Sequence, residues 1–317
     1  MILNSIIVAI LMTSNTRWYP RFQFSKSCFN EQSNFGWNNL GFSIMHYFSG
    51  NLDYLIVSKT LGTYFLGIYE FAYRVPYIIH QRLVQPVGLV IYPAMSKVKT
   101  DREAVFELYS DTIYLLSFIV FPLLGGMIVV ANEMVSVIWG DKWLEVVLPL
   151  QILAFCTILR VWPQSIGAVF LIDNRPDIPF KISIFVLVFS LVFVSSFAYF
   201  WGIIGVAWGM VFSLIPSYYA VYLSLKRLNK TFLHIFHRLY PIIIITLLMM
   251  SIVYLFKSFI LIDFLLIINL IFSVFIGIFT FIFLFVMIFK KDVLYVLRVL
   301  YEKSNNRFFE KLIFRLS

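Results

Sequence analysis

The sequence predicts an all-α protein in which a bundle of helices crosses a membrane many times. Of its 317 residues, 61% are hydrophobic and only 13% are charged, well below the roughly 25% of charged residues in a soluble domain. Several stretches lack any charge over about 20 residues, the length of helix that spans a bilayer. The 25 lysines and arginines lie mostly between these stretches. We therefore expect a polytopic transmembrane bundle, with no nucleic acid as partner.

The uncharged stretches define eight full spans in chain order. A first apolar segment, 1–12, is too short to cross a bilayer as a helix and is interpreted as a partial ninth span. The stretch 182–225 is too long for one helix, and Trp201-Gly202 divides it into two. Full spans are expected at 32–52, 75–96, 112–132, 146–172, twice within 182–225, and at 239–256 and 264–289.

Positive charge predicts the orientation of these spans. Eight spans assign the loops alternately to the two sides of the membrane, and one side receives most of the lysines and arginines. The opposite side receives only Lys59, Arg74, Lys142 and Lys257. Because basic loops stay in the cytoplasm, we expect a cell inner-membrane protein with a cytoplasmic C-terminus. Its organisation is then a partial helix (1–12), a cytoplasmic linker (13–31), a six-helix unit (32–225), two additional spans (226–289) and a basic amphipathic tail (290–317).

Two arginines fall inside expected spans, Arg82 and Arg160. A charge at that depth is unfavourable by about 2.5–3.5 kcal/mol on insertion scales, so it marks a functional site. In a regular helix Arg82 would share a face with Gln85, and Arg160 would share one with Gln164. Guanidinium and amide groups suit phosphate and sugar hydroxyls. The alternative is that each arginine reaches the membrane interface or makes a purely structural pair.

Other polar residues have two interpretations each. Asn51 and Asp53 close the first full span and could line a substrate path or simply solvate the interface. Tyrosines such as Tyr69 and Tyr73 could stack on sugars, although tyrosine also anchors spans at the membrane interface.

The sequence contains no signature of an enzyme. It has no Walker loop, GxSxG, HExxH or DxD motif, the patterns that would position a phosphate, a nucleophile or a metal. His234 and His237 have no third ligand nearby, and Cys28 and Cys156 lack the spacing of a zinc site. We expect neither catalysis nor a cofactor or metal.

The segment from Asn51 to Lys97 resembles the Wzx-type polysaccharide flippases of O-antigen, colanic acid and teichuronic acid synthesis, a branch of the multidrug, oligosaccharidyl-lipid and polysaccharide exporters. Further similarity lies in Arg17–Pro20, Trp139–Trp143 and Arg175–Asp177. The shared elements are Asn51-Leu-Asp53, Leu61-Gly62, Gly67-Ile-Tyr69, Ala72-Tyr73-Arg74 and Tyr92-Pro93-Ala94.

This resemblance implies a two-lobe exporter of which the chain forms the C-terminal lobe and two extra helices, an N-terminally truncated member whose partner is a missing first lobe. It implies translocation of a polyprenyl-diphosphate-linked oligosaccharide through the membrane lipid for polysaccharide or lipopolysaccharide biosynthesis. Two sets of residues would then lie on the substrate path: Arg82, Gln85, Arg160 and Gln164 in the cavity, and Asn51, Asp53, Tyr69, Tyr73 and Arg74 in or beside the shared motifs.

Three other functions stay open. A cation-coupled multidrug exporter would need carboxylates inside the membrane, whereas Asp53 and Asp111 stand near span ends. A membrane glycan polymerase or acyltransferase would need a large extracytoplasmic loop or a catalytic histidine with an acid, and the expected outer loops are short. An inactive fragment, or half of a split transporter, would follow from the absence of the first lobe.

Overall fold

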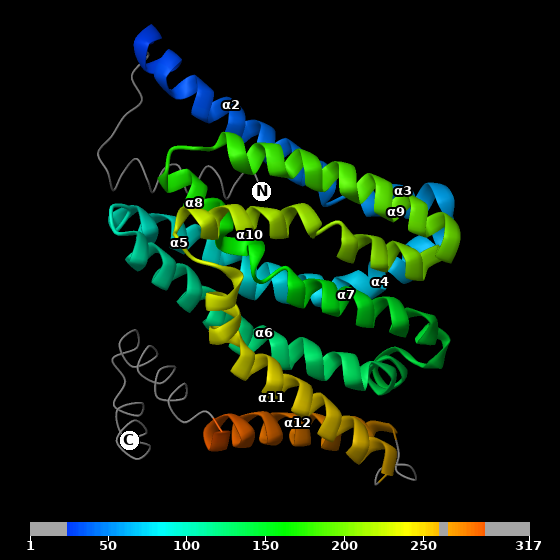
Figure 1. Ribbon diagram of the computed structural model, residues 1–317. Coiled ribbons are helices and arrows are strands. Elements are labelled where there is room, and N and C mark those ends of the chain that lie inside the picture. Colours follow the sequence, from blue (N-terminus) through cyan, green and yellow to red (C-terminus); the bar gives the residue numbers. More distant parts are fainter. Residues whose placement is uncertain (1–23, 260–265, 289–317) are drawn as a thin grey trace, which may run out of the picture.

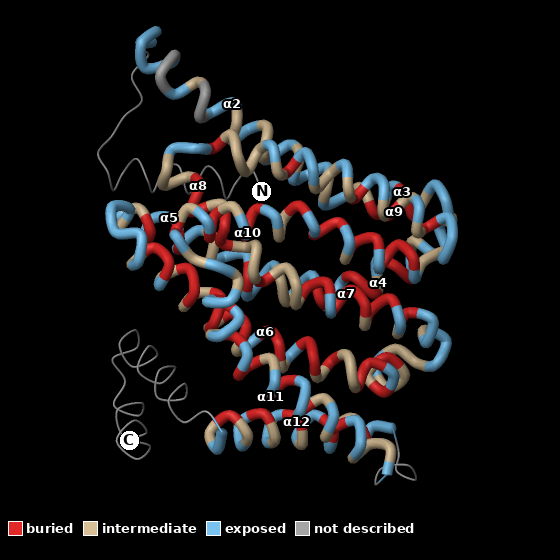
Figure 2. The backbone as a smooth tube through the Cα atoms, in the orientation of Figure 1, coloured by how far each residue is buried: buried red, intermediate tan, exposed pale blue. Residues whose placement is uncertain are grey.

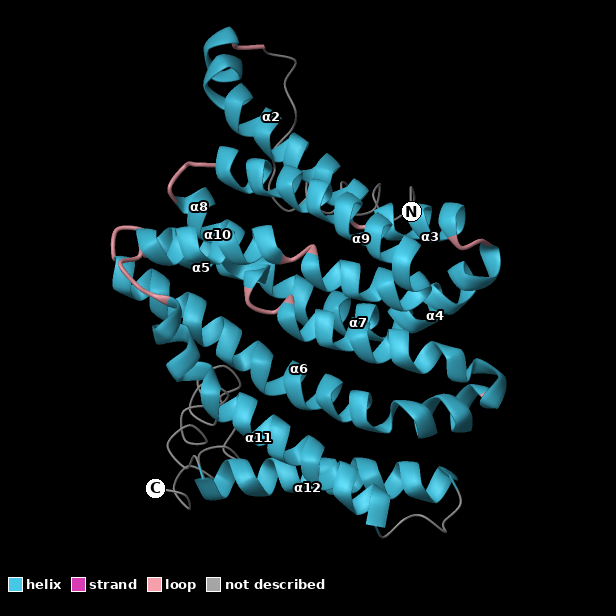
Figure 3. Ribbon diagram, turned by 45° about the vertical axis from the view of Figure 1, so that its right-hand side comes forward, coloured by secondary structure: helices cyan, strands magenta, loops and turns pink. Residues whose placement is uncertain are grey.

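The computed structural model describes residues 24–259 and 266–288, and every regular element within these ranges is a helix. The expected all-α class is confirmed. The partial helix 1–12, the beginning of the linker 13–31 and the tail 290–317 lie outside the described residues. The helices lie in a stack of roughly aligned layers, with α2 and α9 at one edge and α12 at the other (Figures 1 and 3).

The first layer consists of α2 (Lys26–Ser49), α3 (Leu52–Thr60) and α9 (Asp177–Phe212). Gly50 and Asn51 interrupt the helix between α2 and α3. The Asn51 side chain donates to the carbonyl oxygen of Tyr47 at 2.7 Å, so it satisfies a backbone group at this end of α2. Gly41 admits the ring of Phe180, because a Cβ at Gly41 would lie 2.5 Å from that ring.

The α9 assignment contains two helices joined at a sharp kink. Gly202 has φ 58° and ψ −139°, a conformation open to glycine but strained for other residues. After the kink the chain returns so closely that a Cβ at Gly205 would clash with the carbonyl oxygen of Phe197. Small residues permit such close backbone approach between membrane helices. The expected division at Trp201-Gly202 is confirmed.

The next layers contain a nearly continuous helical segment and the longest helix. The segment is α4 (Thr63–Ile79), the π-helical turn η1 (His80–Val84) and α5 (Gln85–Lys97), followed by α6 (Arg102–Trp139). Asp101 caps α6 by accepting from the backbone N–H groups of Glu103 and Ala104. The remaining elements of this part are η2 (Asp141–Val146), α7 (Val147–Leu159), η3 (Pro163–Ser165), α8 (Ile166–Ile172) and α10 (Ile215–Arg227).

Two ion pairs hold α11 (Phe232–Phe259) against α6. Arg238 pairs with Asp111 near one end of the contact. Lys257 Nζ lies 2.8 Å from a carboxylate oxygen of the buried Glu133 near the other end. The last described helix, α12 (Leu266–Ile288), packs on α11 and α6 and leaves most of its large apolar side chains exposed, as expected for a helix facing lipid.

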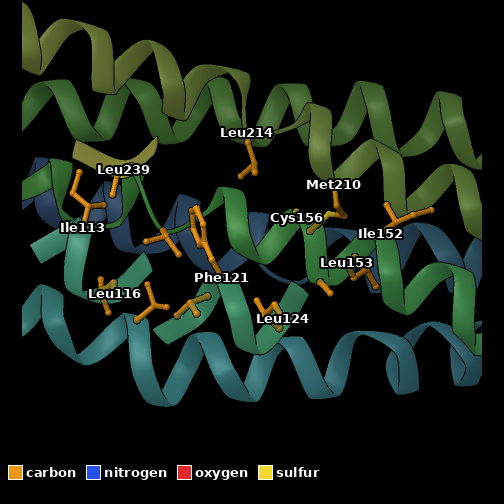
Figure 4. Close-up of a cluster of buried hydrophobic side chains, with 14 of the residues drawn as sticks. Ile113, Leu116, Phe121, Leu124, Ile152, Leu153, Cys156, Met210, Leu214 and Leu239 are labelled. Carbon is orange, nitrogen blue, oxygen red and sulfur yellow. The ribbon is translucent and has the colours of Figure 1, made fainter. Parts of the chain in front are cut away.

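The buried apolar side chains run through the middle of the stack, from α4 through α7 to α6 and on to α11 (Figure 2). Figure 4 shows these side chains converging from successive helices: those of Phe121 and Leu124 come from α6, those of Leu153 and Cys156 from α7, and that of Leu239 from α11. Because lipid offers no hydrophobic effect between helices, close packing of this kind is what holds the layers together.

Polar contacts gather at two opposite ends of the helices. At one end, Asp173 accepts from Arg102 at 2.7 Å and from Arg227 at 3.1 Å, which ties the termini of α6, α8 and α10 together. At the other end, the Tyr64 hydroxyl donates to Glu145 at 3.0 Å, between α4 and η2. Each group of contacts therefore joins segments that the predicted alternation of spans places on the same side of the membrane.

Within the part of the chain that the structure describes, five helical segments are long and apolar enough to cross a membrane: 102–139, 141–159, 177–227, 232–259 and 266–288. The count of eight is thus not confirmed and stays a prediction. The segment 177–227 counts once although Gly202 kinks it, α2 carries polar residues such as Gln32 and Asn39, and the expected span 75–96 is divided by η1.

Two expected boundaries are wrong. The stretch after the first span is not a loop, because it forms α3 and most of α4, and Arg74 therefore lies within a helix. The expected single span 146–172 is broken after Leu159 and resumes as a regular helix only at Ile166.

The pair between Lys257 and Glu133 can be tested by removing one partner. Lys257→Met should lower the free energy of unfolding by about 3 kcal/mol, because Glu133 would stay buried without its counter-ion. Thermal unfolding of the protein in detergent measures this loss. The double variant with Glu133→Leu should regain most of the stability, and Lys142→Met, at an exposed lysine, serves as control. Equal stability of the single and double variants would contradict a buried ion pair.

Candidate functional site

A π-helical turn interrupts the long helical segment that carries Arg82. Pro86 has no N–H to offer the carbonyl group of Arg82, and its ring would clash with that carbonyl in a regular α-helix. The wider turn from His80 to Val84 relieves this conflict, and the N–H of Gln85 bonds to the carbonyl of His80, five residues back. Single π turns of this kind are frequent at functional sites. Arg82 and Gln85 both end up exposed at this turn.

A second interruption positions Arg160 at the end of α7. Pro163 cannot donate to the carbonyl of Leu159, so the helix stops there. The Tyr218 hydroxyl of α10 donates to that carbonyl at 2.8 Å instead. The Tyr109 hydroxyl of α6 donates to the carbonyl of Trp162 at 2.9 Å. Neighbouring helices therefore satisfy the backbone groups that the break leaves free, which stabilises the break.

The break brings Arg160 into contact with α4. Its Nη1 donates to the hydroxyl of Tyr73 at 3.2 Å. One turn earlier on α4, the hydroxyl of the fully buried Tyr69 donates to a carboxylate oxygen of Asp53 at 2.6 Å. The two tyrosine rings stack with their centroids 6.0 Å apart, and Tyr54 packs edge-on against both. These residues of α3, α4 and α7, namely Asp53, Tyr54, Tyr69, Tyr73 and Arg160, are named here the polar cluster.

Two histidines and an amide adjoin the polar cluster. The positive charge of Arg160 acts on both His46, an exposed residue of α2, and His80 of η1. The Gln164 side chain adjoins the His80 ring. Among the described residues Arg160 forms no ion pair with a carboxylate, and the polar groups around it include the Tyr73 hydroxyl and the thiol of Cys156, one turn earlier on α7.

The expected site residues fall into two groups. The structure brings Asp53, Tyr69, Tyr73 and Arg160 together and places Gln164 beside them. Arg160 and Gln164 do not share a helix face, because the helix breaks between them, and tertiary contacts bring them to the same region instead. Asn51 instead caps the end of α2. Arg74, Arg82 and Gln85 are exposed along one side of α4, η1 and α5, together with Glu70 and Gln81, and these five form the polar face.

Sequence reasoning missed His46, His80 and Tyr54. His46 is isolated in an otherwise uncharged stretch, and a single histidine carries no ligand pattern. His80 directly precedes Gln81 and Arg82, so its position in the same polar run was the available signal.

The chain is similar in sequence to several known proteins. Residues 1–148 match the model of a family described as "Polysaccharide biosynthesis protein". The chain is 29% identical over 164 residues to the teichuronic acid biosynthesis protein TuaB of Bacillus subtilis (strain 168). It is 30% identical over 166 residues to the lipopolysaccharide biosynthesis protein WzxC of Escherichia coli (strain K12). Each of these matches covers 52% of this chain and 34% of the relative's length.

A third relative and a solved structure extend the comparison. The probable low-salt glycan biosynthesis flippase Agl15 of Haloferax volcanii is 26% identical over 209 residues, which cover 65% of this chain and 43% of the relative. The structure of the lipid II flippase MurJ, in its inward closed conformation, superposes with a TM-score of 0.66 at 16% identity. It covers 86% of this chain and 57% of the MurJ chain, so the likeness concerns the fold.

The apolar helices and these likenesses define the chain as a multi-pass α-helical membrane protein with a MurJ-like transporter fold. Within that class, the expected resemblance to the Wzx-type polysaccharide flippases is confirmed. The matched segments span only about a third to two fifths of the curated relatives' length.

The helix break at Arg160 predicts unequal roles for two neighbouring tyrosines of α10. Tyr218→Phe should destabilise the protein by about 1–2 kcal/mol, because the carbonyl of Leu159 would lose its donor. Tyr219→Phe is the matched control, since Tyr219 is 58% exposed. Thermal unfolding in detergent compares the two variants, and equal midpoints would show that the hydroxyl of Tyr218 does not stabilise the break.

Proposed function

We propose that this chain forms one half of a flippase that moves a polyprenyl-diphosphate-linked oligosaccharide across the cytoplasmic membrane for polysaccharide biosynthesis. The observation that carries the proposal is Arg160, a half-buried cation held in a helix break by Tyr73 and without a carboxylate partner among the described residues. A cation that is held in place and not neutralised by a carboxylate is suited to bind an anionic ligand. The relatives named for lipopolysaccharide, teichuronic acid and lipid II give the ligand its class.

The chemistry of the surroundings fits a diphosphate joined to sugars. A guanidinium binds phosphate oxygens through two parallel N–H groups, which an ammonium cannot reproduce. Gln164 and His80 lie beside it and offer donors and acceptors that suit sugar hydroxyls. Asp53 and Tyr69 are buried, so we assign them to positioning Tyr73 and Arg160 and not to direct contact with the ligand.

The polar face completes the proposed path. Glu70, Arg74, Gln81, Arg82 and Gln85 are exposed along one helical segment, and lipid cannot solvate such groups at membrane depth. They require water or another protein surface. We propose that they line a water-filled cavity closed by a second six-helix lobe. The relatives are much longer than the matched segments, which leaves room for such a lobe in them.

The same proposal sets the orientation. The ion pairs among Arg102, Asp173 and Arg227 join loops that carry many of the lysines and arginines. Since basic loops stay on the cytoplasmic side, this end of the bundle and the C-terminal tail face the cytoplasm of the inner membrane. The cavity then takes the glycan lipid from the cytoplasmic leaflet and delivers it to the outer one. No catalytic step is part of this function.

Export of polysaccharide tests the proposal in cells that lack their own flippase. The longest reading frame containing these 317 residues is expressed, and surface polysaccharide and membrane abundance are measured. Arg160→Gln should reduce export roughly 10- to 100-fold at unchanged abundance, because charge-assisted hydrogen bonds contribute about 1.5–3 kcal/mol each. Arg82→Gln should also reduce export. Lys142→Gln should not, because Lys142 lies in an exposed turn at the end of the bundle opposite the ion pairs of Asp173.

Unchanged export by both Arg160→Gln and Arg82→Gln would contradict an anion site on this path. Lost abundance in place of lost export would assign the two arginines to structural roles. Arg160→Lys separates the two properties of the guanidinium, because lysine keeps the positive charge but cannot offer two parallel N–H groups to a phosphate.

A further inference from the structure

Asp53 is a buried carboxyl group that the proposed transport path does not use. It is 1% exposed. One of its oxygens, Oδ2, accepts the hydrogen bond from Tyr69, and the other, Oδ1, is buried without a hydrogen-bond partner. Among the described residues no lysine, arginine or histidine forms an ion pair with it. A carboxylate buried away from water without an ion-pair partner is unfavourable, and a neutral carboxylic acid is the form that such a site accepts more readily.

We propose that Asp53 is a proton-binding site and that its protonation is linked to anion binding at Arg160. The linkage rests on the proposed function, because it takes Arg160 as the anion site. The step is simple: one proton from water adds to Oδ1, the carboxylate becomes a neutral carboxylic acid, and no other bond changes. Tyr69 keeps its hydrogen bond to Oδ2 in both forms.

Two stacked tyrosines connect the opposite charges. Tyr69 and Tyr73 are one turn apart on α4, with Asp53 at the first hydroxyl and Arg160 at the second. Because Arg160 stands at the other end of this pair from Asp53, its positive charge favours the ionised form of the carboxyl group. Such attraction is strong where water is excluded.

An anion bound to Arg160 would neutralise the charge that supports ionised Asp53. The carboxylate then loses its stabilisation and takes up a proton. Linkage is reciprocal, so protonation of Asp53 tightens anion binding at Arg160 by the same factor. The fold thus makes the affinity for the anion dependent on pH.

Other titratable groups around Asp53 do not replace Arg160 in this role. Tyr54 belongs to α3 itself, Cys156 lies on α7, and His46 is an exposed residue of α2. Lys59 and Glu70 are exposed. The remaining element packed on α3 is α9, whose titratable residues stand in its first turns and at an exposed position beside its kink: Asp177, Lys181 and Tyr199.

Infrared spectroscopy of the full chain in lipid nanodiscs tests the proton site without any substrate. The expected spectrum contains a carbonyl band of a protonated carboxylic acid that fades as the pH rises and is missing from Asp53→Asn. Asp141→Asn, at an exposed aspartate, should leave the band unchanged. Tyr69→Phe, which keeps the carboxyl group but removes its donor, should retain the band to higher pH. A band that survives Asp53→Asn, or no titrating band at all, would overturn the proposal.

Inorganic pyrophosphate tests the linkage. At a pH where Asp53 is largely ionised, its addition should increase the band, and its Kd should fall about tenfold on acidification, within the usual range of coupling between sites. Arg160→Gln should retain the band to higher pH and show no response to pyrophosphate. Pyrophosphate that binds without changing the band refutes the linkage. If pyrophosphate does not bind, yet Asp53 titrates and Arg160→Gln shifts that titration, the proton site stands and the proposed anion site fails.

Discussion

The arrangement of this molecule depends on the placement of one cation, Arg160, inside a helical bundle. Its charge is unfavourable in a membrane unless polar groups surround it. The structure supplies them by ending α7 at Leu159, turning Tyr73 toward the guanidinium and gathering Gln164 and His80 alongside. The hydroxyls of α6 and α10 satisfy the backbone of the break, so distant helices all contribute to a single position.

The surrounding layers give this position its rigidity. Ion pairs at both ends of α11 hold it against α6, and the kink at Gly202 returns the chain onto α9 at close backbone distance. A ligand group that contacts Arg160 therefore meets a side chain held by a packed scaffold. Preorganised charge of this kind recognises an anion more strongly than a mobile surface residue, because less conformational freedom is lost on binding.

Much of the fold could be predicted from the sequence, because membrane helices require long uncharged stretches, and these can be recognised from the order of residues alone. The break at Trp201-Gly202 also carried a local signal. The interruption at Arg160 and the π turn did not, since proline inside a membrane helix can be accommodated in several ways that depend on neighbouring helices. The outer loop expected before Arg74 was wrong for a related reason: α3 and α4 carry Asp53, Glu70 and Arg74, so their sequence looks too polar for a span.

The candidate site was predictable only in part. Arg160 was visible as a charge inside a span, and Asp53, Tyr69 and Tyr73 were visible through a family resemblance. Their contact with one another was not, because it joins residues of three helices, and Arg160 lies 87 positions after Tyr73. His46 carried no local pattern, and the only local signal at His80 was its position next to Gln81 and Arg82, so the electrostatic coupling of both to Arg160 became apparent only in the structure.

Native mass spectrometry of the purified protein with a polyprenyl diphosphate and with the matching uncharged polyprenol tests the central claim most directly. The account predicts that the diphosphate lipid stays bound in preference to the alcohol, and that Arg160→Gln abolishes this preference while the protein stays folded. Equal retention of both lipids, or an unchanged preference in Arg160→Gln, would contradict the claim that the cation in the helix break recognises the diphosphate.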